Sequence, residues 1–167
     1  MHIQQKIGNL NFHPTNKNID WLELQWYETN KRVLHKKTRS GKEVVMKFLK
    51  ENQNLAQSDI IYEDAETIIA IDIQPCETIV IKPKTMFEMA AVCYEIGNKH
   101  LPLFFQDDEL LIAFEAPLFN LLVSAGYDVI KEKRKLINPL KTSVSSHAHG
   151  GSESLFSKIM KLSTSSE

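Results

Sequence analysis

Histidine is the residue type in this sequence whose placement could support metal chemistry. The chain carries six of them, at His2, His13, His35, His100, His147 and His149. A neutral imidazole nitrogen binds borderline metal ions such as nickel, copper and zinc. One residue separates His147 from His149 in a stretch rich in serine and glycine, so both imidazoles can turn toward one ion with little strain. Composition leaves two interpretations of this pair open, auxiliary metal ligands or incidental histidines of a disordered linker.

His100 stands in the segment Gly97-Asn98-Lys99-His100-Leu101-Pro102, directly after a predicted helix. We expect Gly97 to let the chain reverse and Pro102 to stiffen the exit, so that the imidazole is held at a rigid corner. This local pattern by itself still favours a structural role for His100. The histidines at 2, 13 and 35 are isolated from one another, and we interpret them as surface or structural residues.

Enzyme signatures are missing from the sequence. It contains no His-Glu-x-x-His, no Gly-x-Ser-x-Gly and no His-x-Glu followed by Pro-Cys-x-x-Cys. We expect Asp107-Asp108-Glu109 at a hairpin tip, where carboxylates are solvated. Cys76 and Cys93 are too few and too far apart for a zinc knuckle or a disulfide framework, so we interpret both as structural. No catalytic residue is assigned, and the protein is not expected to be an enzyme.

Length and composition fit one ordinary globular domain or two small ones. The chain has 167 residues, of which 43% are hydrophobic and 25% charged, with a formal net charge of -1. Such a charge gives no basic excess for a nucleic-acid backbone. No apolar run approaches the ~20 residues that span a bilayer, and the first residues do not lead into a signal-peptide core. We therefore expect a cytoplasmic protein that binds neither nucleic acid nor a membrane.

Residues 1–75 are predicted to form an all-β domain. Short β-rich runs, several of which alternate polar and apolar residues, predict strands over residues 21–27, 31–37, 43–48, 59–63 and 67–73. The break Thr38-Arg39-Ser40-Gly41-Lys42 supplies Gly41 where a hairpin turn needs a positive φ.

Residues 76–140 are predicted to form a ferredoxin-like βαββαβ domain. The expected elements are a strand over 77–82, a helix over 86–96, a short run over 103–105, a strand over 109–114, a helix over 118–124 and a strand over 127–133. Thr85 is placed to cap the first helix, with Glu88 at the capping-box position. The predicted fold class is therefore α+β. Residues 141–167 are expected to be a flexible histidine-containing tail, in which a short terminal helix is left open.

The segment around His100 resembles a known family signature. Val92-Cys93-Tyr94-Glu95-Ile96-Gly97-Asn98-Lys99-His100-Leu101-Pro102-Leu103 is similar to the Tyr-x-(Leu/Ile)-Gly-Asn-(Arg/Lys)-His-x-Pro motif of the UreE urease accessory family. The run from Lys36 to Val44 looks like the hairpin of that family's first domain. Phe119-Asn120-Leu121-Leu122 with Gly126-Tyr127 resembles its second helix and final strand. The resemblance spans roughly residues 1 to 150.

The resemblance implies a homodimeric nickel chaperone with a peptide-binding-like β domain and a ferredoxin-like metal domain. Such proteins supply nickel, their carried ion, to the urease assembly machinery, which includes an accessory GTPase and the apo-urease complex. His100 matches the family's interface histidine, while His147 and His149 match variable tail histidines that add ligands. Two tail histidines fit delivery of a single ion better than nickel storage. Zinc or copper is expected to bind the same site.

Ligand chemistry agrees with this implied function. A histidine-only site without thiolates binds firmly but still exchanges its ion, as a carrier needs. At a two-fold interface each His100 would meet its symmetry mate, which doubles the number of ligands. The alternative is a non-metal interaction module whose β domain binds an extended peptide.

Overall fold

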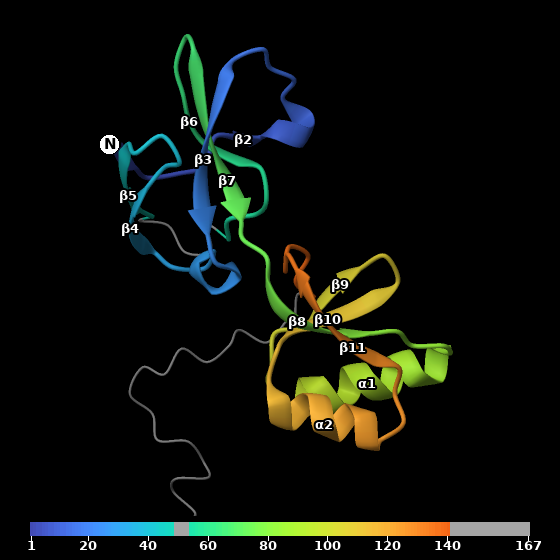
Figure 1. The fold of residues 1–167 in the computed structure, drawn as a ribbon. Helices are drawn as coiled ribbons and strands as arrows, with labels where there is room; N and C mark the ends of the chain where they lie inside the picture. Colours follow the sequence, from blue (N-terminus) through green and yellow to red (C-terminus); the bar gives the residue numbers. More distant parts are fainter. Residues whose placement is uncertain (49–53, 141–167) are drawn as a thin grey trace, which may run out of the picture.

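The chain folds into a strand-rich N-terminal domain and a C-terminal domain built from one sheet and two helices (Figure 1). The computed structural model describes residues 1–48 and 54–140. This arrangement confirms the predicted α+β fold class. The predicted tail over residues 141–167, with His147 and His149, lies outside the described residues.

Two sheets build the N-terminal domain. One has the strand order β1-β5-β4 and the other the order β2-β6-β7-β3. The strands are β1 (His2–Ile3), β2 (Gly8–Asn9), β3 (Asn18–Leu24), β4 (Val33–Lys37), β5 (Glu43–Lys47), β6 (Asp59–Glu63) and β7 (Thr67–Ile73). The predicted strands over 59–63 and 67–73 match β6 and β7 residue for residue.

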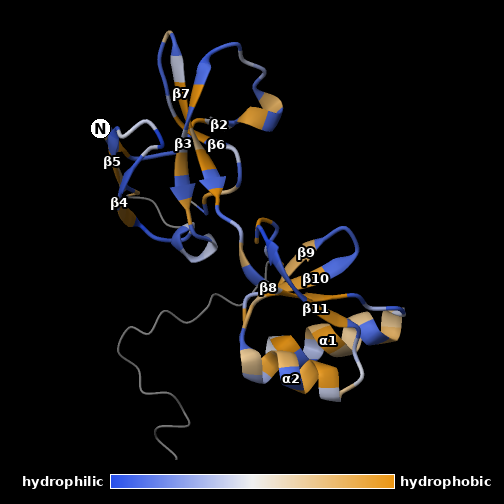
Figure 2. Cartoon of the chain, viewed as in Figure 1, coloured by the Kyte–Doolittle hydropathy of each residue, from blue (hydrophilic) through white to orange (hydrophobic). Residues whose placement is uncertain are grey.

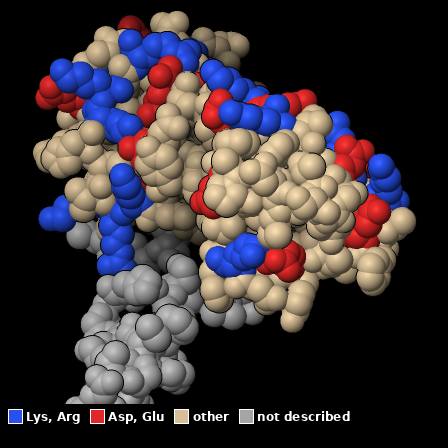
Figure 3. Space-filling view, turned by 60° about the horizontal axis from the view of Figure 1, so that its bottom comes forward, with Lys and Arg blue, Asp and Glu red and all other residues tan. Residues whose placement is uncertain are grey.

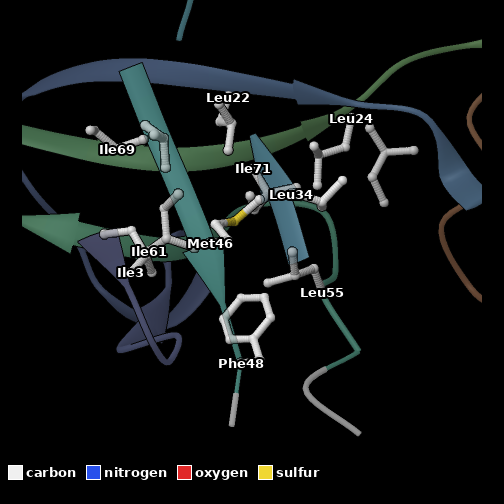
Figure 4. Packing of buried hydrophobic residues seen from close by; sticks show 12 residues of the cluster. Ile3, Leu22, Leu24, Leu34, Met46, Phe48, Leu55, Ile61, Ile69 and Ile71 are labelled. Atoms are coloured by element: carbon white, nitrogen blue, oxygen red, sulfur yellow. The ribbon is translucent and has the colours of Figure 1, made fainter. Parts of the chain in front are cut away.

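The core of this domain lies between the two sheets (Figure 4). Leu34 and Met46 come from one sheet and meet Leu22, Ile69 and Ile71 of the other. Side chains of a strand alternate between its faces, so residues two apart share this core. Burying each such side chain stabilises the fold by about 1.5–3 kcal/mol.

The hairpin between β4 and β5 turns at the predicted glycine. Gly41 has φ +92°, which a residue with a Cβ adopts only with strain. Asp20 on β3 holds the turn, since it accepts hydrogen bonds from the backbone N–H of Ser40 at 3.0 Å and from the Ser40 hydroxyl at 2.5 Å. Burial by itself would raise the pKa of Asp20. The hydrogen bonds that Asp20 accepts lower the pKa by more than burial raises it, so the pKa lies below its ordinary value.

The strand predicted over residues 21–27 was placed wrongly at both ends. β3 spans Asn18–Leu24, and Trp26–Glu28 form a single 3₁₀ turn. The backbone N–H of Gln25 donates to the Glu28 carboxylate at 2.9 Å, which closes a capping box that ends the extended run. Trp26 packs against the core of the N-terminal domain, and its ring also meets Phe104 of the C-terminal domain edge-on at 5.7 Å.

The C-terminal domain has the predicted βαββαβ order. Its elements are β8 (Cys76–Ile81), α1 (Met86–Asn98), β9 (Phe104–Gln106), β10 (Glu109–Ala113), α2 (Ala116–Ser124) and β11 (Val129–Arg134). The sheet is antiparallel throughout, with the order β11-β8-β10-β9. Both helices are largely hydrophobic and cover one face of this sheet (Figure 2).

The two faces of this sheet pack against different parts of the chain. Ile79 and Ile81 of β8 point toward the helices, where they join a cluster with Val92 and Ile96 of α1. Val80, which lies between them in the strand, points to the opposite face and packs against Phe104, Leu111 and Leu136, with Trp26 of the N-terminal domain alongside. This second face therefore forms the junction between the domains.

Candidate functional site

His100 occupies a strained turn at the end of α1. Its φ is +55°, in the left-handed region that glycine prefers and that Asn, Asp and His adopt most readily among other residues. Its backbone N–H donates to the Gly97 carbonyl oxygen at 3.0 Å, as at many helix ends. The side chain is exposed. The histidine is therefore itself the residue that reverses the chain.

This geometry corrects two sequence-based expectations. The helix was predicted to stop at Ile96 and Gly97 to provide the reversal, but α1 continues through Asn98 and Gly97 lies inside it. A helical glycine weakens a helix but does not end it, because it can still adopt helical dihedrals. The left-handed conformation falls instead at His100, three residues later.

Packing on both sides fixes the corner that carries His100. Before it, Ile96 is fully buried in the cluster between the helices and the sheet. After it, Leu101 and Leu103 are half-buried against the same cluster. Thr85 caps the other end of α1 as predicted, because its hydroxyl accepts the Glu88 backbone N–H at 3.1 Å. The exposed imidazole thus projects from a well-anchored backbone.

An exposed apolar stripe runs along α1 toward His100. Three of its side chains are largely exposed, Met86 at 84%, Phe87 at 81% and Tyr94 at 73%. Ala90 lies between them and Gly97 lies beyond Tyr94, at helical spacing. We call these five residues the α1 stripe. Figure 3 shows a broad surface with few charged residues over the helical side of this domain. Large exposed apolar patches mark sites of interaction.

The chain leaves the described fold close to the His100 corner. After β11 it returns along β9, where the Phe105 backbone N–H donates to the Asn138 carbonyl at 3.0 Å and the Leu140 N–H donates to the Leu103 carbonyl at 2.8 Å. Leu103 is three residues beyond His100. His147 and His149, which lie outside the described residues, therefore follow an exit point that is tied to the segment carrying His100.

The other three histidines that the structure describes lie in the N-terminal domain. His2 on β1 and His35 on β4 are exposed, and β5 runs between their strands, so both flank Val45. The His13 ring nitrogen lies 3.6 Å from the Glu63 carboxylate. Of the histidines that the structure describes, His100 alone belongs to the C-terminal domain.

The predicted hairpin tip and the cysteines have the expected surroundings. Asp107 and Asp108 form a two-residue turn, each with positive φ, between β9 and β10. Cys76 and Cys93 are free and half-buried, and burial raises the pKa of the Cys93 thiol.

Across residues 1–48 and 54–140, no three His, Cys, Asp or Glu side chains come together as a set that could hold a metal ion. No helix in those ranges is long and apolar enough to cross a membrane.

The sequence predictions had missed two features of this region. The α1 stripe has a sequence signal, since Met86, Ala90 and Tyr94 recur at four-residue spacing, but periodicity cannot tell an exposed apolar face from a buried one. The return of residues 135–140 along β9 has no such signal, because it depends on contacts between segments far apart in the chain.

The two domains together define the class of this protein. It is a two-domain binding protein whose ferredoxin-like unit presents an exposed histidine at the end of a helix. The sequence matches the UreE urease accessory protein N-terminal domain over residues 2–74 and the C-terminal domain of the same family over residues 76–156. The chain therefore belongs to the UreE family of urease accessory proteins. Membership makes it an accessory protein and not an enzyme, as the sequence predicted.

Individual relatives give the same result. The urease accessory protein UreE of Flavobacterium johnsoniae is 48% identical over 163 residues, which cover 97% of this chain and 99% of that protein. UreE of Actinobacillus pleuropneumoniae is 46% identical over 127 residues, covering 76% of this chain and 68% of that protein. UreE of Acetivibrio thermocellus is 33% identical over 134 residues, with coverages of 80% and 87%.

Proposed function

We propose that this protein is a nickel chaperone that binds the ion at a dimer interface and delivers it to the urease assembly machinery. The observation that carries the proposal is the placement of His100, an exposed imidazole on a fixed turn at the end of an exposed apolar stripe. Family membership supports the urease-directed role. The same site would accept zinc or copper, since imidazole binds all three ions.

The α1 stripe supports association through this helix. A dimer that buries Met86, Phe87 and Tyr94 would remove large apolar side chains from water. A Cβ added at Gly97 would meet no atom within 4 Å, so this chain's own packing does not require glycine there. A small residue lets a partner helix approach closely. Two His100 side chains would then face each other near the two-fold axis.

Tail histidines would complete the ligand set. Two imidazoles at the axis leave coordination positions open, and His147 and His149 follow Leu140 by seven and nine residues. Seven residues can span at most roughly 25 Å, at about 3.3–3.6 Å per residue. Because Leu140 is bonded to Leu103, this reach includes the surroundings of His100. All of these ligands would be neutral imidazoles. Such a site binds the ion and still allows its release to a partner.

The proposed partners follow from this role. We place delivery in the cytoplasm, with the accessory GTPase and the apo-urease complex as receivers of the ion. Nickel titration of the purified protein, with molecular mass measured alongside, tests the proposal. We expect a dimer that binds one tightly held nickel ion per two chains. A protein that takes up no nickel would contradict the proposal and favour a non-metal interaction module whose β domain binds extended peptide.

A further inference from the structure

Residues 135–140, which we call the clasp segment, follow β11 and cross the C-terminal sheet. β11 and β9 are opposite edges of that sheet. The clasp segment carries the chain from the first edge to the second, where Pro139 pairs with Phe104 and the Leu140 N–H donates to the Leu103 carbonyl. Figure 1 shows it, at the orange end of the described chain, between the two domains.

Successive residues of the clasp segment contact different domains. The Lys135 ammonium lies 2.5 Å from the carboxylate of Asp72, which belongs to β7 of the N-terminal domain. Leu136 is 2% exposed and packs with Val80 on the C-terminal sheet. Ile137 is half-buried against the core of the N-terminal domain. Since side chains of an extended chain alternate between its two sides, both domains can hold the segment at once.

The N-terminal domain fixes the carboxylate that accepts Lys135. The side-chain amides of Gln57 and Gln74 donate to Asp72, each at 3.1 Å, and the Arg39 guanidinium lies 3.3 Å away. Burial by itself would raise the pKa of Asp72, but the hydrogen bonds from Lys135 and Gln57 outweigh burial and keep the pKa below its ordinary value. A partly buried ion pair with such support stabilises more than a pair on the open surface.

An apolar contact lies beside this ion pair. Trp26 of the N-terminal domain packs against the cluster that contains Leu136 and Phe104 of the C-terminal domain. Burial of apolar surface favours association of the domains but has no preferred direction, whereas a hydrogen-bonded ion pair depends on geometry. The two contacts together therefore specify how the domains are joined.

We infer that the clasp segment holds the two domains together as one cooperative unit, with Lys135 and Ile137 as the residues that bind the N-terminal domain. The strand after His100 then keeps a fixed position relative to that domain, because Leu103 and Phe104 are bonded to the clasp segment. This inference concerns the fold and does not depend on nickel, so it can fail while the proposed function stands.

The chain supplies a separate probe for each domain. Trp21 and Trp26 are its two tryptophans, and both belong to the N-terminal domain. Among the described residues, the α-helices α1 and α2 both belong to the C-terminal domain. Unfolding in urea, followed by tryptophan fluorescence and by the helical circular dichroism signal, therefore reports on the two domains separately.

The main variant combines Lys135→Met with Ile137→Ala in the full chain. It removes the ion pair and the apolar contact with the N-terminal domain but leaves Leu136 in place on the C-terminal sheet. Lys133→Met is the matched control, since Lys133 is an exposed lysine on β11, two residues earlier. All proteins are compared at the same concentration, so that any association contributes equally.

We expect the two probes to give one shared transition in the wild type and in Lys133→Met. In the double variant the two transitions should separate. The dependence of each on urea should fall to roughly half, because each domain then exposes its own surface alone. Lys135→Met and Asp72→Asn, made singly, should lower this dependence in the same direction, which keeps the test informative if the double variant does not fold.

Two results would overturn the inference. Separate transitions in the wild type would mean that the domains already unfold independently. Shared transitions in every clasp variant, moved to lower urea with an unchanged dependence on urea, would mean that the segment adds stability without joining the domains.

Discussion

The Leu140 backbone N–H donates to the Leu103 carbonyl at 2.8 Å, and this bond ties the exit of the chain to the segment that follows His100. Leu103 and Leu140, which are distant in sequence, thereby become neighbours. The ion pair between Asp72 and Lys135 extends the same connection to the N-terminal domain. Both domains therefore hold the chain after β11, while His100 itself lies in the ferredoxin-like domain.

Replacement of His100 is expected to abolish tight nickel binding and leave the proposed dimer intact. The side chain is exposed, so its loss removes a ligand and little packing. His100→Asn is the sharper variant because asparagine tolerates the left-handed conformation better than alanine. Isothermal titration with nickel measures the effect, and His35→Ala, an exposed histidine of the N-terminal domain, is the matched control. An unchanged titration curve for His100→Asn would remove His100 from the site.

Nickel affinity is expected to fall steeply below about pH 6.5. A histidine in water has a pKa near ~6.5, and imidazole binds metal only when neutral, so each ligand costs up to about one decade of affinity per pH unit. His100→Asn and the chain ending at Ser146 should give progressively shallower slopes between pH 5.5 and 8. A flat wild-type profile would assign the ion to carboxylates such as Asp107, Asp108 or Glu109.

The ion pair between Asp72 and Lys135 should stay intact across that pH range. The pKa of Asp72 lies below its ordinary value in the folded protein, so its contribution to stability is present above ~4 and is lost as the pH falls through the lower folded value. Between pH 5.5 and 8 Asp72 therefore remains ionised and bound to Lys135. The slope of nickel affinity against pH then reports imidazole protonation and not loss of the ion pair between Asp72 and Lys135.

Tyr94→Glu is expected to convert the proposed dimer to monomers. Tyr94 is 73% exposed in the centre of the α1 stripe, and a carboxylate there would have to be buried without a partner on association. Analytical ultracentrifugation measures the change, and nickel affinity should fall with it. Phe12→Glu, at a residue 88% exposed in the N-terminal domain, is the control and should remain dimeric. A dimeric Tyr94→Glu protein would place the interface elsewhere.

Alanine at two glycines should change stability in opposite directions. An added Cβ meets nothing within 4 Å at Gly41 or at Gly97. Gly41 has φ +92°, so Gly41→Ala should cost roughly 1–2 kcal/mol of unfolding free energy. Gly97 is helical, so Gly97→Ala should gain up to ~1 kcal/mol. Urea unfolding in the Tyr94→Glu background measures both, so that association does not contribute. Changes of the same sign would contradict this account of Gly97.

The sequence by itself determined the elements and their order. Short β-rich apolar runs specified β6 and β7, the Thr85 cap specified the start of α1, and Gly41 specified the hairpin turn. Each of these signals is complete within a few neighbouring residues, because it depends on local dihedrals, capping bonds and side-chain periodicity. The motif around His100 likewise pointed to the family before any geometry was known.

Tertiary structure alone decided how His100 is presented and where the tail begins. His100 reverses the chain because Ile96, Leu101 and Leu103 pack around the corner. The presence of Gly97 in the sequence does not predict this packing. Asp72 and Lys135 are 63 residues apart, and their meeting requires two folded domains docked through Trp26 and Phe104. Such contacts depend on the shapes of complete surfaces, so no local pattern encodes them.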